Sequence, residues 1–342
     1  MSNDREVAAP HPREAAVLFG HAAAEGAMLE SYRSGRIAHA WLLGGPRSIG
    51  KATLAYRMAK FVLAYPDPAS DHVQAAESLD VDTNNPAAHR IANASHSDFL
   101  ALERVIGDNG KLNRTIRVEQ VRRCVPFFGS TAGEGGWRIA IVDAVDDLQS
   151  EGENALLKIL EEPPVRSLLL LVSHAPGRIL PTIRSRCRQL LLRPLSDHDL
   201  VAAIAAASGR PADDPELIDA AAAADGSVER ALELLDGAAL ALRQRVLLLL
   251  DRLPEVDPPA IHALGDALSG VDPGPLSTFM ETVNGWLSAK VNEQWSALSR
   301  AGPAALAWEQ INTAARDAEA YNLERKPLVF NVFRLLAEAA RG

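Results

Sequence analysis

The chain has 342 residues, of which 35 are Lys or Arg and 44 are Asp or Glu, so its formal net charge is −9. At roughly 100–200 residues per domain, this length suits two or three domains, and a hydrophobic content of 47% excludes wholesale disorder. The negative charge argues against wrapping nucleic acid over a broad surface, because such binding needs many cations to displace counterions.

Two cysteines, Cys124 and Cys187, occur in the chain. Two thiols cannot form a disulfide framework or a four-cysteine zinc site. The longest apolar runs, such as residues 246–250, are too short to span a bilayer, and the polar N-terminal segment has no export-signal pattern. We therefore expect a reducing, cytoplasmic location.

Short apolar runs alternate with helical runs up to about residue 195. The apolar runs lack strict alternation, as expected for strands that are buried on both faces. They cover residues 40–43, 99–102, 138–142 and 168–172. Strands that alternate with helices predict a parallel sheet with crossover helices.

Apolar residues at helical spacing predict helices over residues 51–63, 118–124 and 154–160. Pro126 and Pro163 are expected to end the second and third of these helices.

Residues 65–95 are rich in Pro, Asp, Asn, Ser and His and predict an irregular insertion. From residue 197 the chain becomes rich in Ala and Leu, which predicts helices almost throughout. The sequence therefore predicts an α/β domain over residues 1–195, a helical domain over 196–254 and a second helical domain over 255–342.

A glycine-rich segment between the first predicted strand and helix fits G-x-x-x-x-G-K, from Gly45 to Lys51. Its glycines let backbone N–H groups form a nest around phosphates, and the helix N-terminus and the lysine add positive potential. Gly45, Gly50 and Lys51 are therefore candidate nucleotide-binding residues. The next residue is Ala52, where a hydroxyl normally ligates Mg²⁺, and Thr53 stands about 100° further round the helix.

A carboxylate, Asp143, ends the predicted strand at residues 138–142 and is the second candidate element of a nucleotide site. Hydrolysing enzymes of this type place a glutamate next to it, but Ala144 follows here. Asp146 and Asp147 lie beyond the strand end. Two groups needed for hydrolysis, the metal hydroxyl and the catalytic carboxylate, are therefore missing at their expected places.

Three segments occur in a distinctive order: the phosphate loop, NALLKILEEPP at residues 154–164, and SHAPGRILPTIRSRC at residues 173–187. Over roughly residues 15–235, the chain resembles the clamp-loader branch of the AAA+ proteins. The resemblance implies a P-loop α/β domain of the RecA-like type, followed by a helical lid over residues 196–254. It also implies an all-α collar over residues 255–342, which holds subunits in a ring.

In clamp loaders the arginine of the SRC motif reaches the ATP of a neighbouring subunit. The match places this role on Arg186, with Ser185 beside it. Together with Ala52 and Ala144, the resemblance implies a degraded ATPase that is inactive alone but donates an arginine finger in the loader of DNA polymerase III. It would help load the sliding clamp onto primed DNA, with the gamma/tau and delta subunits as partners and no membrane involved.

Two further departures from the family concern ligands. Many relatives carry a four-cysteine zinc module after the first P-loop helix, but residues 65–95 contain no Cys. The candidate metal ligands there are His72, His89, Asp71, Asp80 and Asp82, and we expect no zinc or other metal.

The second departure lies in the segment that resembles the phosphate sensor of the lid. Glu229 stands where active relatives carry Arg, and Arg230 comes one place later. Whether ATP still binds this chain is therefore left open by the sequence.

Two alternatives remain at this stage. One is an active AAA+ ATPase of the gamma/tau type that has rebuilt its metal site with Thr53 and Asp146. The other is a DNA-binding protein that uses the basic run at residues 178–193. A second basic cluster is expected to be a solvated face, with a subunit interface as the alternative; its members are Lys111, Arg114, Arg117, Arg122 and Arg123.

Overall fold

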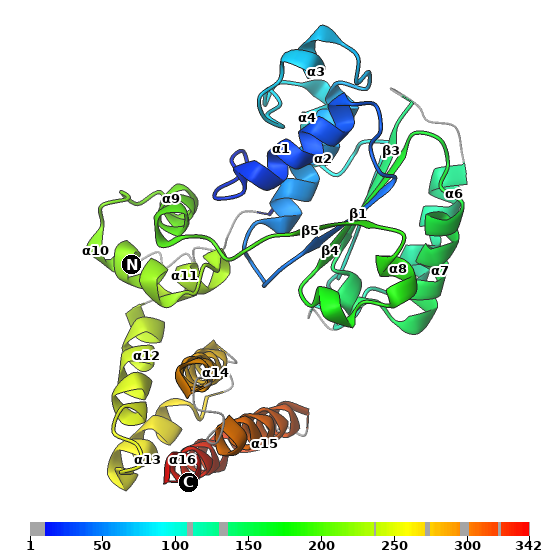
Figure 1. Cartoon of the computed structure of the whole chain (residues 1–342). Helices are drawn as coiled ribbons and strands as arrows, with labels where there is room; N and C mark the ends of the chain where they lie inside the picture. The colour runs from blue at the N-terminus through cyan, green and yellow to red at the C-terminus, as the bar shows by residue number, and fades with distance from the viewer. Residues whose placement is uncertain are drawn as a thin grey trace. The chain divides into compact units, whose positions relative to one another are not determined.

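The computed structural model describes residues 11–107, 112–129, 136–235, 237–270, 274–294, 301–320 and 323–341. The chain divides into two compact units, Met1–Leu232 and Glu233–Gly342 (Figure 1). The boundaries predicted at residues 195 and 254 stay predictions.

A five-stranded parallel sheet lies at the centre of the first unit, in the order β2-β3-β4-β1-β5. Its strands are β1 (Ala40–Gly44), β2 (Phe99–Glu103), β3 (Arg138–Asp143), β4 (Ser167–Ser173) and β5 (Arg188–Leu191). The four strands predicted from the sequence are confirmed. The sequence does not predict β5, because this edge strand is largely exposed and carries polar residues.

Helices cover both faces of this sheet, because alternate residues along each buried strand point to opposite sides. Trp41 and Leu43 of β1 pack with α1 and α2, whereas Ala40 and Leu42 pack with α5, α6, α7 and α8 (Figure 1). The bounds are α1 (Ala22–Arg33), α2 (Lys51–Ala64), α3 (Asp71–Ala75), α4 (Pro86–Ala92), α5 (Val118–Arg122), α6 (Cys124–Gly129), α7 (Ser150–Glu161) and α8 (Pro181–Arg184). This architecture confirms the predicted P-loop α/β fold class.

Three more helices follow β5, and the first unit ends within the third of them. They are α9 (Asp197–Ser208), α10 (Pro215–Ala223) and α11 (Val228–Leu234), and α9 packs against α10. Short 3-10 turns occur at Val145–Asp147 and Pro176–Arg178.

The structure corrects two of the sequence predictions. Pro126 does not end a helix: it lies in the first turn of α6, where the missing proline N–H has no helical partner to lose. The 65–95 segment is not wholly irregular, because it contains α3 and α4. The side chains of Ser70 and Asn85 cap the N-termini of these two helices.

The second unit is all-helical, as predicted. Its helices are α12 (Gly237–Leu250), α13 (Pro258–Ala267), α14 (Gly274–Gln294), α15 (Ala301–Ala320) and α16 (Arg325–Arg341). α12 packs on α14, and α13 and α15 pack on α16, around a core that includes Phe279 and Phe333. Among the helices of the described residues, none is both long and apolar enough to cross a membrane.

Candidate functional site

The phosphate loop connects β1 to α2, which is the context that its motif requires. Gly45, Ser48 and Gly50 have φ values of 147°, 57° and 99°. Glycine is required at position 45, because an added Cβ would lie 2.5 Å from the carbonyl oxygen of Leu192. Ser48 adopts the left-handed conformation with a side chain, which costs about 1 kcal/mol. The loop therefore has the turned backbone of a phosphate nest.

Lys51 begins α2 and is only 3% exposed. Burial lowers the pKa of its amine to about 8, although the nearby carboxylates of Asp143 and Asp146 oppose this change. Its Nζ donates a hydrogen bond to the carbonyl oxygen of Pro46, within the loop itself. Thr53 follows Ala52 in the first turn of α2 and is half-buried. The predicted residues Gly45, Gly50, Lys51 and Asp143 thus gather where the sheet strands end.

Asp143 ends β3, in register with Glu103 at the end of β2. Burial raises the pKa of Asp143 to about 6, Glu103 adds to the increase, and the cation of Lys51 opposes it. Ala144 is fully buried and carries no group that could polarise water. The site therefore keeps a carboxylate that faces Lys51 but lacks its catalytic neighbour.

Replacing Asp143 with asparagine is expected to stabilise the chain by roughly 1–3 kcal/mol near pH 7.5, because the amide carries no charge to bury. The pKa in the folded chain, about 6, lies above the ordinary value of 3.8. Ionisation therefore costs stability above pH 6, and the cost fades as the pH falls towards 4. Urea denaturation near pH 7.5 and pH 4.5 measures this. Equal effects of Asp143→Asn on the free energy of unfolding at both pH values would contradict a raised pKa of Asp143 in the folded chain.

Asp146 has both carboxylate oxygens engaged at the end of β4. It accepts hydrogen bonds from Ser173 Oγ at 3.2 Å, from the His174 backbone N–H at 2.7 Å and from the Ala175 backbone N–H at 2.9 Å. Asp146 therefore anchors the turn after β4. This commitment leaves it poorly suited to hold a metal ion.

His174 is a site residue that the sequence analysis does not single out. Burial lowers the pKa of its imidazole to about 4, and the cations of Lys51 and Arg47 lower it further. Its Nδ1 is buried and has no hydrogen-bond partner within the described part of the chain. The only sequence signal is its place directly after the apolar run of β4.

The residues present do not fit the hydrolysis of a magnesium nucleotide. Ala52 and Ala144 supply no oxygen ligand or base, and Asp146 is committed to the turn after β4. Glu229 accepts a hydrogen bond from Ser48 Oγ in the loop.

Arg186 follows α8 and lies two residues before β5 begins. Its Nη1 donates to the carbonyl oxygen of Thr182 at 3.0 Å, and its Nη2 pairs with Glu161 Oε1 at 3.0 Å. The arginine side chain is 36% exposed. Ser185 Oγ also donates to the Thr182 carbonyl oxygen, at 3.2 Å, and remains exposed. Ser185 and Arg186 thus share one turn at the surface.

The structure separates Arg186 from the phosphate loop. Leu191 of β5 is in register with Gly44, and Arg188 is in register with Trp41. At about 3.3 Å per residue, β5 begins roughly 10 Å along the sheet from the level of Gly44. Arg186 precedes that start, so it lies at the edge where the parallel strands begin, opposite the loop.

The two cysteines, Cys124 and Cys187, are both buried. Burial raises the pKa of Cys124 and of Cys187 to about 12, so neither thiol is a nucleophile near neutral pH.

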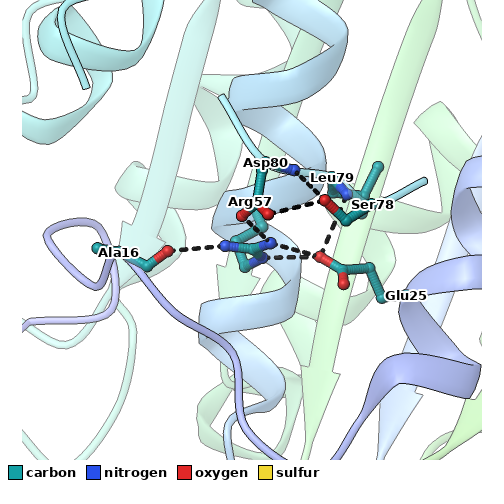
Figure 2. A network of polar contacts seen from close by, with 6 residues as sticks. All are labelled: Ala16, Glu25, Arg57, Ser78, Leu79 and Asp80. Carbon is teal, nitrogen blue, oxygen red and sulfur yellow. Dashed lines mark hydrogen bonds and ion pairs between the residues drawn. The ribbon is translucent and has the colours of Figure 1, made fainter. Parts of the chain in front are cut away.

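The 65–95 segment is held to the domain by Arg57 of α2 (Figure 2). The guanidinium donates to Glu25 Oε1 at 2.8 Å, to the Ala16 carbonyl oxygen at 2.8 Å and to Asp80 Oδ1 at 2.5 Å. Asp80, one of the candidate metal ligands, is thus an arginine partner. Within the described ranges, no group of three or more His, Cys, Asp or Glu residues could hold a metal ion.

Other candidate ligands and cations also have local contacts. His72 packs on the ring of Tyr65 with centroids 3.9 Å apart, and Arg188 packs on Trp41 at 4.6 Å. In the basic cluster, Lys111 lies outside the described residues. The other members, Arg114, Arg117, Arg122 and Arg123, are exposed.

A family model described as DNA polymerase III, delta subunit, matches residues 20–196. A DNA polymerase III subunit delta' of Pseudomonas aeruginosa is 38% identical over 152 residues, which cover 44% of this chain and 42% of that protein. The subunit delta' of Escherichia coli is 29% identical over 170 residues, 49% of this chain and 46% of that one. A DNA polymerase III subunit gamma of Buchnera aphidicola is 30% identical over 182 residues, 51% and 43% of the two chains.

The chain thus aligns with less than half of the length of these relatives. Within the clamp loaders, Ala52 and Ala144 point to the delta-prime type, and the delta' relatives confirm that resemblance. Because the family model covers just over half of the chain, the protein belongs to the DNA polymerase III, delta subunit family.

Proposed function

We propose that this chain is a non-hydrolysing, delta-prime-like subunit of the bacterial clamp loader. It supplies Arg186 in trans to the ATP site of a neighbouring subunit and so helps to load the sliding clamp onto primed DNA. Its partners are then the gamma/tau and delta subunits and the clamp, with DNA reached through the complex, in the cytoplasm. The relatives named delta' and gamma support this choice.

One observation carries the proposal: Arg186 and the chain's own phosphate loop lie at opposite edges of the sheet. The strand register places the start of β5 roughly 10 Å from the level of Gly44, and Arg186 comes before that start. An arginine side chain in this place serves a phosphate outside its own chain far more readily than one in its own loop. This placement supports action in trans.

The contacts of Arg186 also suit a finger. Its partner, Glu161, is 52% exposed, and an exposed ion pair contributes only about 0–1 kcal/mol. Exchanging this carboxylate for a phosphoryl group therefore costs little. A guanidinium is always charged and can bind two phosphoryl oxygens at once.

The phosphate loop supports the other half of the proposal, the absence of hydrolysis. Ala52 provides no metal ligand, and Ala144 provides no base. An active ATPase of the gamma/tau type would need Thr53 and Asp146 to rebuild the metal site, and the three hydrogen bonds of Asp146 at the end of β4 disfavour that alternative.

Steady-state ATP hydrolysis by the isolated chain tests this half. We expect a turnover at least about 100-fold below that of an active loader subunit, because the Mg²⁺ hydroxyl and the catalytic carboxylate are both missing. The chain with Lys51→Ala is the background control. Turnover comparable to that of an active subunit, and abolished by Lys51→Ala, would overturn the proposal.

A further inference from the structure

The phosphate loop is contacted by the first turn of α11, at Val228 and Glu229. The backbone N–H of Val228 donates to the carbonyl oxygen of Ser48 at 2.9 Å. The hydroxyl of Ser48 donates in turn to the carboxylate of Glu229. Both contacts meet on Ser48, a residue in the middle of the loop, so the backbone and one acidic side chain of this segment bind the loop together.

Close packing fixes the segment in this position. Gly226 has a φ of 78°, and an added Cβ there would lie 2.6 Å from the backbone nitrogen of Leu195. The neighbouring cation does not compensate for Glu229, because Nη1 of Arg230 pairs with Asp225 at 2.7 Å. The first turn of α11 therefore presents the carboxylate of Glu229 to the loop, while Arg230 pairs with Asp225.

A carboxylate in this place opposes the purpose of a phosphate loop. The backbone N–H groups of the loop and the start of α2 favour an anion. The carboxylate of Glu229 already places a negative charge beside Ser48 of the loop. The cation of Lys51 meanwhile donates to the loop's own Pro46 carbonyl oxygen. An incoming triphosphate would have to separate Glu229 from Ser48 or bind beside a like charge.

We infer that Glu229 keeps nucleoside polyphosphates out of this loop. Its carboxylate binds the hydroxyl of Ser48 and repels the negatively charged phosphates. The inference rests on the proposed function and deepens it, from a loop that does not hydrolyse ATP to a loop that excludes it.

Calorimetric titration of the full chain with MgATP tests the inference. Glu229→Gln keeps an acceptor for the Ser48 hydroxyl and removes only the charge, and Glu229→Arg reverses the charge. We expect the dissociation constant for MgATP to fall at least about tenfold with Gln and about 100-fold with Arg. The first change removes the repulsion between the carboxylate and the phosphates, and the second adds an attraction. Circular dichroism melting confirms that each variant is folded.

Two controls locate the effect. Asp219→Asn removes one negative charge from an exposed position of α10 and is expected to leave the affinity within about twofold, since distant exposed charges are screened. Adding Lys51→Ala to Glu229→Arg is expected to abolish the gained affinity, which places the nucleotide in the loop.

The inference would be overturned if the wild-type chain and both Glu229 variants bound MgATP with affinities equal to within about twofold. It would also be overturned if the affinity gained by Glu229→Arg persisted after Lys51→Ala was added. Neither result bears on hydrolysis, which is measured separately. Turnover by the wild-type chain would instead overturn the proposed function. Tighter MgATP binding without turnover in Glu229→Arg supports both the inference and the proposed function, because Ala52 and Ala144 remain in that variant.

Discussion

Replacing Arg57 with alanine is expected to lower the free energy of unfolding by about 3–5 kcal/mol, the range found when one partner of a buried ion pair is removed. The side chains of Arg57 and Glu25 are 8% and 12% exposed. Without the guanidinium, the Glu25 carboxylate stays buried with a backbone N–H of Leu79 as its remaining contact in Figure 2, at 3.3 Å. The Ala16 carbonyl oxygen and Asp80 lose the same partner.

Urea denaturation of the chain measures this effect. Arg57→Lys is expected to recover only part of the loss, because a single ammonium cannot reach three segments with the geometry of a guanidinium. Arg186→Ala is the matched control, since Arg186 is also paired with a glutamate but is exposed, and its cost is expected to stay below about 1 kcal/mol. A loss for Arg57→Ala no larger than that of the control would refute the structural role of this network.

Arg186→Ala is expected to reduce DNA-stimulated ATP hydrolysis by a reconstituted loader at least about tenfold. An arginine finger raises the rate about 10³–10⁵-fold at the one ATP site that it serves. The other ATP sites of the loader do not face this chain and keep hydrolysing, so the total rate falls by less. Assembly should be unaffected, because the exposed pair with Glu161 contributes little to the fold. Hydrolysis is measured alongside co-elution of the complex.

Two variants separate a finger from a general loss of positive charge. Arg186→Lys keeps the charge but loses the two-pronged donor, so we expect it to remain several-fold below the wild type. Arg184→Ala removes a neighbouring arginine of the same basic run and is expected to leave hydrolysis within about twofold. An equal loss with Arg184→Ala would assign the effect to the basic surface rather than to Arg186.

The strand and helix pattern could be predicted where burial is uniform. β1 and β4 lie between other strands and are buried throughout, so the apolar runs at their centres stand out in the sequence. β5 escapes the same reasoning, because this edge strand begins with the exposed residues Arg188 and Gln189 and contains only two apolar residues, Leu190 and Leu191. A proline ends a helix only when it lies beyond the first turn, and Pro126 lies within the first turn of α6.

The candidate site divides in the same way. The places of Gly45 and Lys51 could be predicted because a local motif encodes the strand, turn and helix around them, and that of Asp143 because it ends an apolar run. The contact of Glu229 with Ser48 joins residues 181 positions apart, and no local pattern encodes such a pair. The ion pair of Arg186 with Glu161 likewise depends on how α7 and α8 pack.

We propose that this chain contributes Arg186 to a neighbour and does not use its own phosphate loop. The most direct test compares ATP hydrolysis by two reconstituted loaders, one with Lys51→Ala and one with Arg186→Ala in this chain. We predict that Lys51→Ala leaves the rate within about twofold of the wild type, whereas Arg186→Ala lowers it at least about tenfold. A large loss with Lys51→Ala and an unchanged rate with Arg186→Ala would contradict the account.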